Sequence, residues 1–401
     1  MRKIINDPVH GFITIDDELI YAIISHPYYQ RLRHIKQMAL AYLVYPGAVH
    51  TRLHHSLGAY HLMGKALEEL RQKGAEITRE ESQGAQIAIL LHDIGHGPFS
   101  HALEHTLANI QHEEISLLIM QKLNEEFQGK LAIAIDIYTN QYPKKFLHQL
   151  VSSQLDVDRL DYLARDSFFT GVSEGVVGYE RIIKMLTVHQ EELLVEEKGI
   201  HSIEKFLIAT RFMYWQVYLH KTVLSSELLL VNILKRAKAL IHQGKNLMAS
   251  PSLYFFLSKQ LNLDDFISNP VCLSHFLNTN DSDVECAIRS WMQHEDSILS
   301  DLCTRLTNRK LLKIEFLQTD DQSKIKSIRE KIQQQFSLDE QSISYYFTES
   351  TTSNKTYNES VDQIKILYKN GTIKPISKVE NTLISSELII PTKKHYICYI
   401  R

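Results

Sequence analysis

The chain has 401 residues, of which 44% are hydrophobic and 23% are charged, with 15 glycines and 9 prolines. This length predicts two or three domains of roughly 150 residues each, and the composition excludes collagen-like and intrinsically disordered proteins. The formal net charge is −3, which argues against a protein that coats nucleic acid with a surface that is basic throughout.

Apolar residues that recur at helical spacing predict a mostly helical N-terminal part. The predicted helices cover residues 28–41, 55–70, 80–92, 112–127, 146–165 and 202–242. Three glycines within residues 171–178 predict a loop. Two short apolar runs on either side of residues 190–192 predict a small β-hairpin over residues 186–196.

The chain changes character toward its C-terminus, where strands are predicted beside helices. The predicted segments are strands at 310–317, 343–347 and 396–400, a polar helix at 321–336 and a hairpin within 364–376. Asn370 and Gly371 are a strong turn signal for that hairpin. We therefore predict a mostly α protein with three parts, at residues 1–245 (a helical core), 246–305 (a helical extension) and 306–401 (an α+β appendage).

No segment of the sequence predicts secretion or membrane insertion. The N-terminus does not resemble a signal peptide. The longest apolar run near the middle, residues 87–91, is far shorter than the roughly 18 residues that a membrane span requires. The four cysteines show no CxxC spacing, so we expect reduced thiols rather than disulfides or a thiolate zinc site. We expect a cytoplasmic protein with no membrane partner.

Histidine is concentrated in the first part of the chain, where twelve of the 20 histidines lie within residues 1–120. Because histidine binds metals and transfers protons near neutral pH, this concentration suggests one of these two roles. Several histidines nevertheless fit a structural or surface role better, and these are His10, His26, His34, His50, His54, His61 and His105.

The apolar run at residues 87–91 ends on His92 and Asp93, just before a Gly-His-Gly-Pro break. Burying a carboxylate alone is very costly, and a bound cation would remove this cost. Imidazole and carboxylate are the usual ligands of zinc, manganese, iron and nickel. Taken alone, however, this segment is explained equally well by a hydrogen-bonded helix end.

A later segment places Asp158, Tyr162 and Asp166 four residues apart, so that they share one face of a helix. Such a face could line a site, or it could be a solvated face held by salt bridges. The segment by itself does not decide between the two interpretations.

Together these segments resemble the HD-domain metal phosphohydrolases, whose signature is Arg-x-x-His, then His-Asp, then a distant Asp. Here the signature falls on Arg52 to His55, on His92 with Asp93, and on Asp158. Longer strings are similar to the deoxynucleoside triphosphate triphosphohydrolase branch, and these are NDPVHG at 6–11, HSLG at 55–58, HDIGHGPFSH at 92–101 and DVDRLDYLARD at 156–166. The resemblance covers residues 1–235 and implies an HD-domain helical core.

The resemblance implies one divalent metal ion, which could be manganese, iron, nickel, zinc or magnesium because mixed nitrogen and oxygen ligation does not select among them. The implied ligands are His55, His92, Asp93 and Asp158. The implied reaction is hydrolysis of deoxynucleoside triphosphates to deoxynucleoside and triphosphate.

The resemblance also implies a proton donor, His112, for the leaving 5′ oxygen, with Glu104 and Glu113 as acidic partners that orient it. The implied catalytic set is His112, Glu113, Glu104 and His101. The implied substrate contacts are Arg52, Gln37, Met38, His96, Arg159, Tyr162, Asp166, Arg211 and Tyr218. Among these, Gln37 and Met38 would pack against the deoxyribose and exclude a 2′-hydroxyl, and Asp166 would contact the 3′-hydroxyl.

Members of this branch are often homo-oligomers, so the resemblance implies a dimer or tetramer that binds nucleotide effectors between its subunits. Positions that match effector contacts are Lys3, Gln30, Arg33 and Arg181. Ser25 departs from the pattern, which has a carboxylate there. Two other functions stay open at this point: an HD phosphodiesterase that acts on another phosphate ester, and a nucleotide sensor without turnover.

Overall fold

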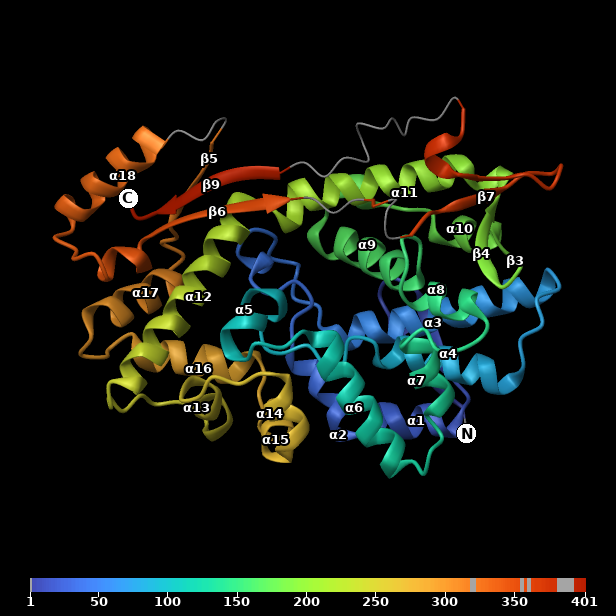
Figure 1. Ribbon diagram of the computed structural model, residues 1–401, viewed down its shortest axis with the longest axis horizontal. Helices are drawn as coiled ribbons and strands as arrows, with labels where there is room; N and C mark the ends of the chain where they lie inside the picture. The colour runs from blue at the N-terminus through green and yellow to red at the C-terminus, as the bar shows by residue number, and fades with distance from the viewer. Residues whose placement is uncertain (1, 318–321, 354–356, 359–361, 381–392) are drawn as a thin grey trace.

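The structure, a computed structural model, describes all residues except 1, 318–321, 354–356, 359–361 and 381–392 (Figure 1). It confirms a mostly α protein with small β-sheets. A hairpin of β1 (Lys3–Asp7) and β2 (Gly11–Ile15) precedes the first helix. Three helices form the centre of the N-terminal part, where α3 (Arg52–Gln72) packs against both α4 (Arg79–Leu91) and α9 (Val157–Thr170).

These helices form where the sequence supplies an apolar stripe and a cap. Thr78 and Glu81 form a capping box at the start of α4, with the Thr78 side chain accepting from the Glu81 backbone N–H at 3.2 Å. The same helix buries Ile87, Leu90 and Leu91 completely. Burying such side chains stabilises the fold by about 1.5–3 kcal/mol each, so this core fixes where α4 ends.

The other α-helices flank this centre, and those from α12 to α18 lie to one side of it, where α12 packs against both α5 and α17 (Figure 1). Their bounds are α1 (Glu18–Ser25), α2 (Pro27–Gln30), α5 (Ser100–Leu107), α6 (His112–Glu126), α7 (Ala132–Tyr138), α8 (Lys145–Val151), α10 (Tyr179–Met185), α11 (Ile200–Met213), α12 (Lys221–His242), α13 (Pro251–Leu257), α14 (Leu263–Ser268), α15 (Pro270–Leu277), α16 (Asp281–Trp291), α17 (Ser297–Thr307) and α18 (Gln322–Gln335).

The prediction of one helix over residues 28–41 is wrong. The helix α2 is followed by a 3₁₀ turn over Arg31–His34, and Ile35 is then extended, with φ −123° and ψ 115°. The reason is a long-range pairing, because Gln37 N donates to His50 O at 3.0 Å and Arg52 N donates to Ile35 O at 2.9 Å. Hydrogen bonds to the segment before α3 therefore replace the helical ones.

Two longer predicted helices are interrupted by side-chain caps. The helix predicted over residues 146–165 is divided into α8 and α9, and the Asp156 side chain caps α9 by accepting from Arg159 N at 2.7 Å. The helix predicted over 202–242 is divided into α11 and α12, which are joined by a π turn over Tyr214–Tyr218. These breaks orient residues that face a common cavity.

The C-terminal region contributes strands to two small sheets. One has the order β3-β4-β7-β8, built from β3 (Leu186–His189), β4 (Glu192–Glu196), β7 (Lys365–Leu367) and β8 (Ile373–Pro375). The predicted hairpins β3–β4 and β7–β8 are both confirmed, with Gly371 at φ +81° between β7 and β8. Because β7 pairs with β4 in parallel, the C-terminal region shares a sheet with the hairpin that follows the central helices.

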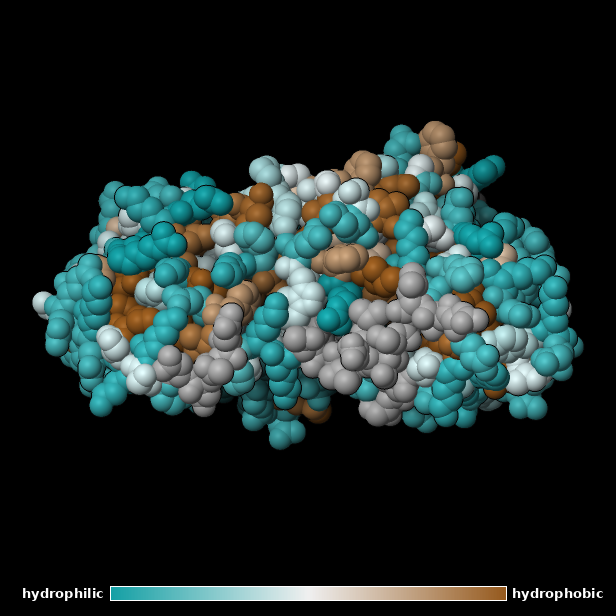
Figure 2. All heavy atoms as spheres, turned by 90° about the horizontal axis from the view of Figure 1, so that it is seen from above, coloured by the Kyte–Doolittle hydropathy of each residue, from teal (hydrophilic) through white to brown (hydrophobic). Residues whose placement is uncertain are grey.

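The second sheet has the order β5-β9-β6, from β5 (Lys313–Leu317), β6 (Phe347–Ser353) and β9 (Lys393–Tyr399). The strand predicted over residues 343–347 is wrong, because Ser342–Tyr345 forms a 3₁₀ turn and the strand begins only at Phe347. Seen from above, the face that carries this sheet shows hydrophilic side chains interspersed with apolar ones (Figure 2).

Among the described residues, no single helix combines the length and apolar character that crossing a membrane requires. One pair of helices, Glu197–Tyr218 and Lys221–His242, meets that requirement by length and composition when taken together, and the pair is bent by 56°.

Candidate metal centre and adjoining cavity

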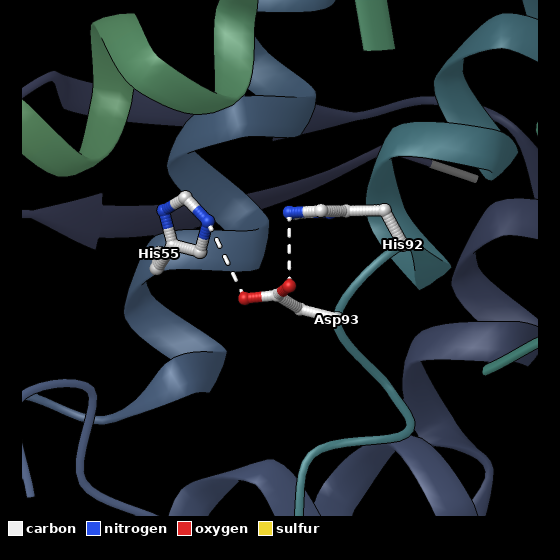
Figure 3. A group of neighbouring side chains, drawn as sticks. All are labelled: His55, His92 and Asp93. Atoms are coloured by element: carbon white, nitrogen blue, oxygen red, sulfur yellow. Dashed lines mark ion pairs between the residues drawn. The ribbon is translucent and has the colours of Figure 1, made fainter. Parts of the chain in front are cut away.

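Four side chains from three places in the sequence converge. His55 lies in α3, His92 and Asp93 directly follow α4, and Asp158 lies in the first turn of α9. The Nε2 atom of His55 lies 3.0 Å from an Asp158 oxygen and 3.7 Å from an Asp93 oxygen. The Nε2 atom of His92 lies 3.3 Å from Asp93 and 3.4 Å from Asp158. Figure 3 shows both rings turned toward the Asp93 carboxylate.

Both imidazoles keep the Nε2 atom available for a ligand. His92 Nδ1 donates to the backbone oxygen of Ile89 at 2.6 Å, and His55 Nδ1 lies 2.7 Å from an Asp161 oxygen. The two Nε2 atoms are buried, and neither makes a hydrogen bond within the described part of the chain. A histidine whose Nδ1–H is held in this way presents a lone pair on Nε2 to a metal. The donor set therefore fits a divalent cation.

The electrostatics of the cluster also favour a cation. Burial opposes protonation of His55, but Asp158 and Asp161 outweigh it and raise the pKa of His55 to about 10. Burial is likewise outweighed at Asp158, whose pKa is held well below its usual range by His55 and His92. The carboxylates are thus charged, and either protons on the imidazoles or a metal ion must balance them.

Behind His55 lies a fully buried ionic network. Asp161 accepts from Arg165 Nε at 2.9 Å, and one of its oxygens lies 2.6 Å from His10 Nε2. Arg165 also donates to Asp7 at 2.8 Å. A Cβ atom on Gly58 would lie 2.0 Å from Asp161 and 2.2 Å from Arg165, so the glycine is what lets α3 approach α9 here. This network orients the His55 ring.

We expect Arg165→Leu to lower the free energy of unfolding by about 3–5 kcal/mol, because it leaves Asp7 and Asp161 buried without their partner. Urea denaturation followed by circular dichroism would measure this. Arg289→Leu is the matched control, since Arg289 is exposed on α16. A loss of under about 1 kcal/mol for Arg165→Leu, the usual range for a surface ion pair, would contradict the role of the network.

Cationic and titratable groups adjoin the cluster. Arg52 is buried and donates to Asp93 at 2.5 Å and to Ser100 Oγ at 2.9 Å. His96 Nε2 lies 3.3 Å from Asp93, and its ring stacks on His112 with centroids 3.8 Å apart. Burial and the Arg52 charge hold the pKa of His96 well below its ordinary value, so this imidazole is neutral at pH 7.

His112 is held by carboxylates. Its Nδ1 lies 2.7 Å from a Glu104 oxygen and 3.3 Å from a Glu113 oxygen. Glu104 also accepts the backbone N–H of His112 at 2.7 Å, which fixes the carboxylate relative to the start of α6. The arrangement can orient a proton on His112 toward a ligand in the adjoining cavity.

A cavity of about 440 Å³ opens beside the cluster, a size within the roughly 300–1,000 Å³ of small-molecule sites. Asp93 and Asp158 contribute to its wall. It also brings together predicted substrate contacts from distant parts of the chain, namely Gln37, Met38, Arg52, His96, Tyr162, Asp166 and Tyr218.

The sequence did not indicate how Asp166 is held in this wall. Asp166 accepts from the Tyr218 hydroxyl at 2.8 Å, and its other oxygen lies 2.7 Å from His50 Nε2. His50 is buried and stacks on Phe169 with ring centroids 4.4 Å apart. His50, for which only a structural role was expected, therefore positions a residue of the cavity.

Other predicted residues are not brought into this wall. Neither Arg159 nor Arg211 is among the described residues that line the cavity, and Arg159 Nε instead donates to Ser153 O at 2.9 Å. The side chain of His101 lies outside what the structure describes. Conversely, Tyr214 and Glu227 line the cavity although neither was predicted to.

Three of the predicted effector contacts, Lys3, Gln30 and Arg33, lie on the N-terminal elements. Gln30 accepts from Arg33 Nε at 2.6 Å, and Lys3 Nζ lies 5.7 Å from the ring centre of Tyr21. Arg181 lies on α10, where it donates to Lys198 O at 3.4 Å. Effector binding, the dimer or tetramer, the cytoplasmic location and the domain boundaries at 245 and 305 stay predictions.

The convergent His and Asp residues on a helical core define an HD-domain phosphohydrolase. The HD domain model matches residues 52–166, and the HD associated region model matches residues 177–248. The chain therefore belongs to the HD-domain phosphohydrolase family.

Its relatives include a phosphohydrolase from Bacteroides thetaiotaomicron with a known crystal structure. The two sequences are 49% identical, and the two structures match over 100% of both chains with a TM-score of 0.96. The uncharacterized protein YwfO of Bacillus subtilis is 32% identical over 94% of this chain and 87% of its own length. The deoxynucleoside triphosphate triphosphohydrolase SAMHD1 of Gallus gallus is 31% identical over 59% of this chain, and the match spans 46% of that relative.

Proposed function

We propose that the chain hydrolyses deoxynucleoside triphosphates to deoxynucleoside and triphosphate, with a divalent metal ion as cofactor. The observation that carries the proposal is the cavity. It joins the His and Asp cluster to a wall with a glutamine, a methionine and a hydrogen-bonded carboxylate, at Gln37, Met38 and Asp166. The similarity to SAMHD1 supports the same substrate class.

His55, His92, Asp93 and Asp158 would hold the metal. When bound there, a divalent ion neutralises phosphate charge and lowers the pKa of a water molecule. Arg52 adds a fixed positive charge at the same end of the cavity, and its bonds to Asp93 and Ser100 keep it in place. These groups would orient the α-phosphate.

His112 would donate the proton that the 5′ oxygen needs to leave. A water oxygen forms a bond to the α-phosphorus and the proton that this water loses passes to solvent. The bond from phosphorus to the 5′ oxygen breaks, the proton of His112 passes to that oxygen, and His112 takes up a proton from solvent afterwards. Glu104 would hold the ring at Nδ1 so that Nε2 faces the leaving group. Triphosphate and a neutral 5′-hydroxyl are then the products.

The reaction is tested by separating the products of each deoxynucleoside triphosphate by anion-exchange chromatography, with Mn²⁺ or Mg²⁺ added. We expect deoxynucleoside and intact triphosphate in equal amounts. Orthophosphate or pyrophosphate in place of triphosphate would refute the proposed reaction. Hydrolysis of cyclic or other phosphate esters alone would favour an HD phosphodiesterase, and tight binding without turnover would favour a sensor.

The sugar preference is tested by Gln37→Ala. We expect the ratio of kcat/KM for deoxyribonucleotide over ribonucleotide to fall about tenfold, because the shorter side chain makes room for a 2′-hydroxyl beside the sugar. Gln72→Ala, on the exposed last turn of α3, is the control. An unchanged ratio would mean that Gln37 does not face the sugar.

A further inference from the structure

One buried carboxylate outside the cavity joins two segments that contribute to the cavity wall. Asp281 is the first residue of α16, and only 2% of its surface is exposed. One of its oxygens accepts the backbone N–H of Phe99 at 2.9 Å, and the other accepts the backbone N–H of Lys36 at 2.9 Å. These partners precede Asp281 by 182 and 245 residues, so a single side chain holds together three distant parts of the chain.

Asp281 is not needed to begin α16, because this helix has its own cap. Asn280 and Asp283 form a capping box, in which the backbone N–H of Asn280 donates to the Asp283 side chain at 2.9 Å. The Asn280 side chain also accepts from the backbone N–H of Ser282 at 2.9 Å. Burying a carboxylate is costly, and here the cost is offset by the two distant segments that Asp281 holds rather than by a task within α16.

The first of these segments is a strained turn beside the metal cluster. Phe99 and Ser100 have φ +50° and +27°, values that residues with a side chain rarely adopt and that persist only where the surrounding structure holds them. The hydrogen bond from Phe99 to Asp281 provides such a hold. The turn places Ser100 Oγ 2.9 Å from Arg52 Nε, and Arg52 in turn donates to Asp93. The orientation of a fixed positive charge in the cavity wall therefore depends on this turn.

The second segment leads into the residues that are expected beside the sugar. Lys36 forms an isolated antiparallel bridge with Thr51, and its ammonium group lies 3.6 Å from an oxygen of Asp281. The next two residues, Gln37 and Met38, line the cavity. A shift of the Lys36 backbone would therefore move both side chains.

We propose that Asp281 is a positioning residue, which holds two parts of the cavity wall in the geometry that binds the nucleotide. Through the turn at Phe99 it orients Arg52, and through Lys36 it places Gln37. Asp281 is not among the described residues that line the cavity, so it acts on the substrate only through these neighbours. The inference rests on the proposed function, since it takes the cavity as the site of a deoxynucleotide.

The test compares wild type with Asp281→Asn, which keeps the size of the side chain but replaces one acceptor oxygen by an amide group that cannot accept a backbone N–H. We expect the KM for dGTP to rise about tenfold, the usual effect of losing a buried hydrogen bond to a charged group. The preference for deoxyribonucleotide over ribonucleotide should fall, because Gln37 is displaced. Metal content should stay at the wild-type level, because the His and Asp cluster keeps all four of its side chains.

A control separates positioning from a loss of folded protein, which would lower kcat but leave KM and the sugar preference unchanged. Asp283→Asn makes the same chemical change in the capping box of the same helix and should keep the wild-type KM and sugar preference. Asp281→Ala removes both acceptors and should raise KM further. If Asp281→Ala does not fold, the comparison of Asp281→Asn with Asp283→Asn decides the result.

A binding measurement distinguishes failure of this role from failure of the proposed function. Equilibrium dialysis of dGTP with His112→Asn, alone and combined with Asp281→Asn, measures binding without turnover. If triphosphate is released but Asp281→Asn keeps the wild-type KM and sugar preference, the positioning role is overturned and the proposed function stands. If no deoxynucleotide releases triphosphate but Asp281→Asn weakens dGTP binding about tenfold, the proposed function fails and the positioning role stands. If no triphosphate is released and dGTP binding is absent or unaffected by Asp281→Asn, both proposals fail.

Discussion

Asp158→Asn is expected to abolish both metal binding and hydrolysis. Among the residues that the structure describes, Asp158 is the one carboxylate within 3.4 Å of both His55 Nε2 and His92 Nε2, so removing its charge opens the cluster. We expect metal affinity to fall by at least ~100-fold. Losing several kcal/mol of charge stabilisation by the metal would lower kcat by about 1,000-fold or more.

Metal content after dialysis, measured by elemental analysis, checks the first effect, and triphosphate release checks the second. Asp264→Asn makes the same chemical change at an exposed position on α14 and should keep both properties. Wild-type metal content in Asp158→Asn would show that the ion, if one binds, is held by other groups.

His112→Asn is expected to lower kcat by about 100- to 10,000-fold, the usual contribution of a positioned proton donor. Metal content should stay at the wild-type level, because His112 lies outside the set of His55, His92, Asp93 and Asp158. The KM should change little, since the lost proton transfer acts in the transition state.

Steady-state kinetics with saturating Mn²⁺ would give kcat and KM separately. His105→Asn, at an exposed position on α5, is the control for a general effect of removing an imidazole. A variant of His112 that keeps full kcat would require another proton donor, and a variant that loses its metal would make His112 a ligand.

The set of residues in the candidate metal centre was predicted from the resemblance to HD-domain phosphohydrolases, whose motifs lie in short strings of this sequence, while the local patterns alone left each segment undecided. His92 and Asp93 follow an apolar helix that had to be buried, and Asp158 occupies the first turn of a helix with a distinct polar face. Local periodicity also gave α3, α4 and α6 to within a few residues. Such features depend on neighbours in the chain, which the sequence displays directly.

The features that the sequence did not display depend on distant partners. Residues 35–40 have a helical rhythm, but their hydrogen bonds go to the segment that precedes α3. Asp161 and Arg165 have the spacing of an ordinary surface ion pair, and only the glycine opposite them on α3 brings the pair into the core. The sequence nevertheless contained a sign of this close approach, because Gly58 lies in the same HSLG string as His55.

The position of Glu227 in the cavity wall also depends on distant parts of the chain and was not predicted from the sequence. Within α12 it is one acid on an amphipathic helix, and nothing local marks it as a residue of the cavity wall. The break between α11 and α12, set in part by the His220 side chain that caps α12, turns this helix toward the cavity. An interpretation of the sequence that treats residues 202–242 as one straight helix therefore does not predict that Glu227 lines the cavity.

The central claim is that water attacks the α-phosphorus and releases the whole triphosphate. Hydrolysis of dGTP in ¹⁸O-labelled water, with mass spectrometry of both products, tests this most directly. We predict one ¹⁸O atom in the triphosphate and none in the deoxyguanosine. Label in orthophosphate or pyrophosphate, or in the nucleoside, would place the broken bond elsewhere and contradict the proposed reaction.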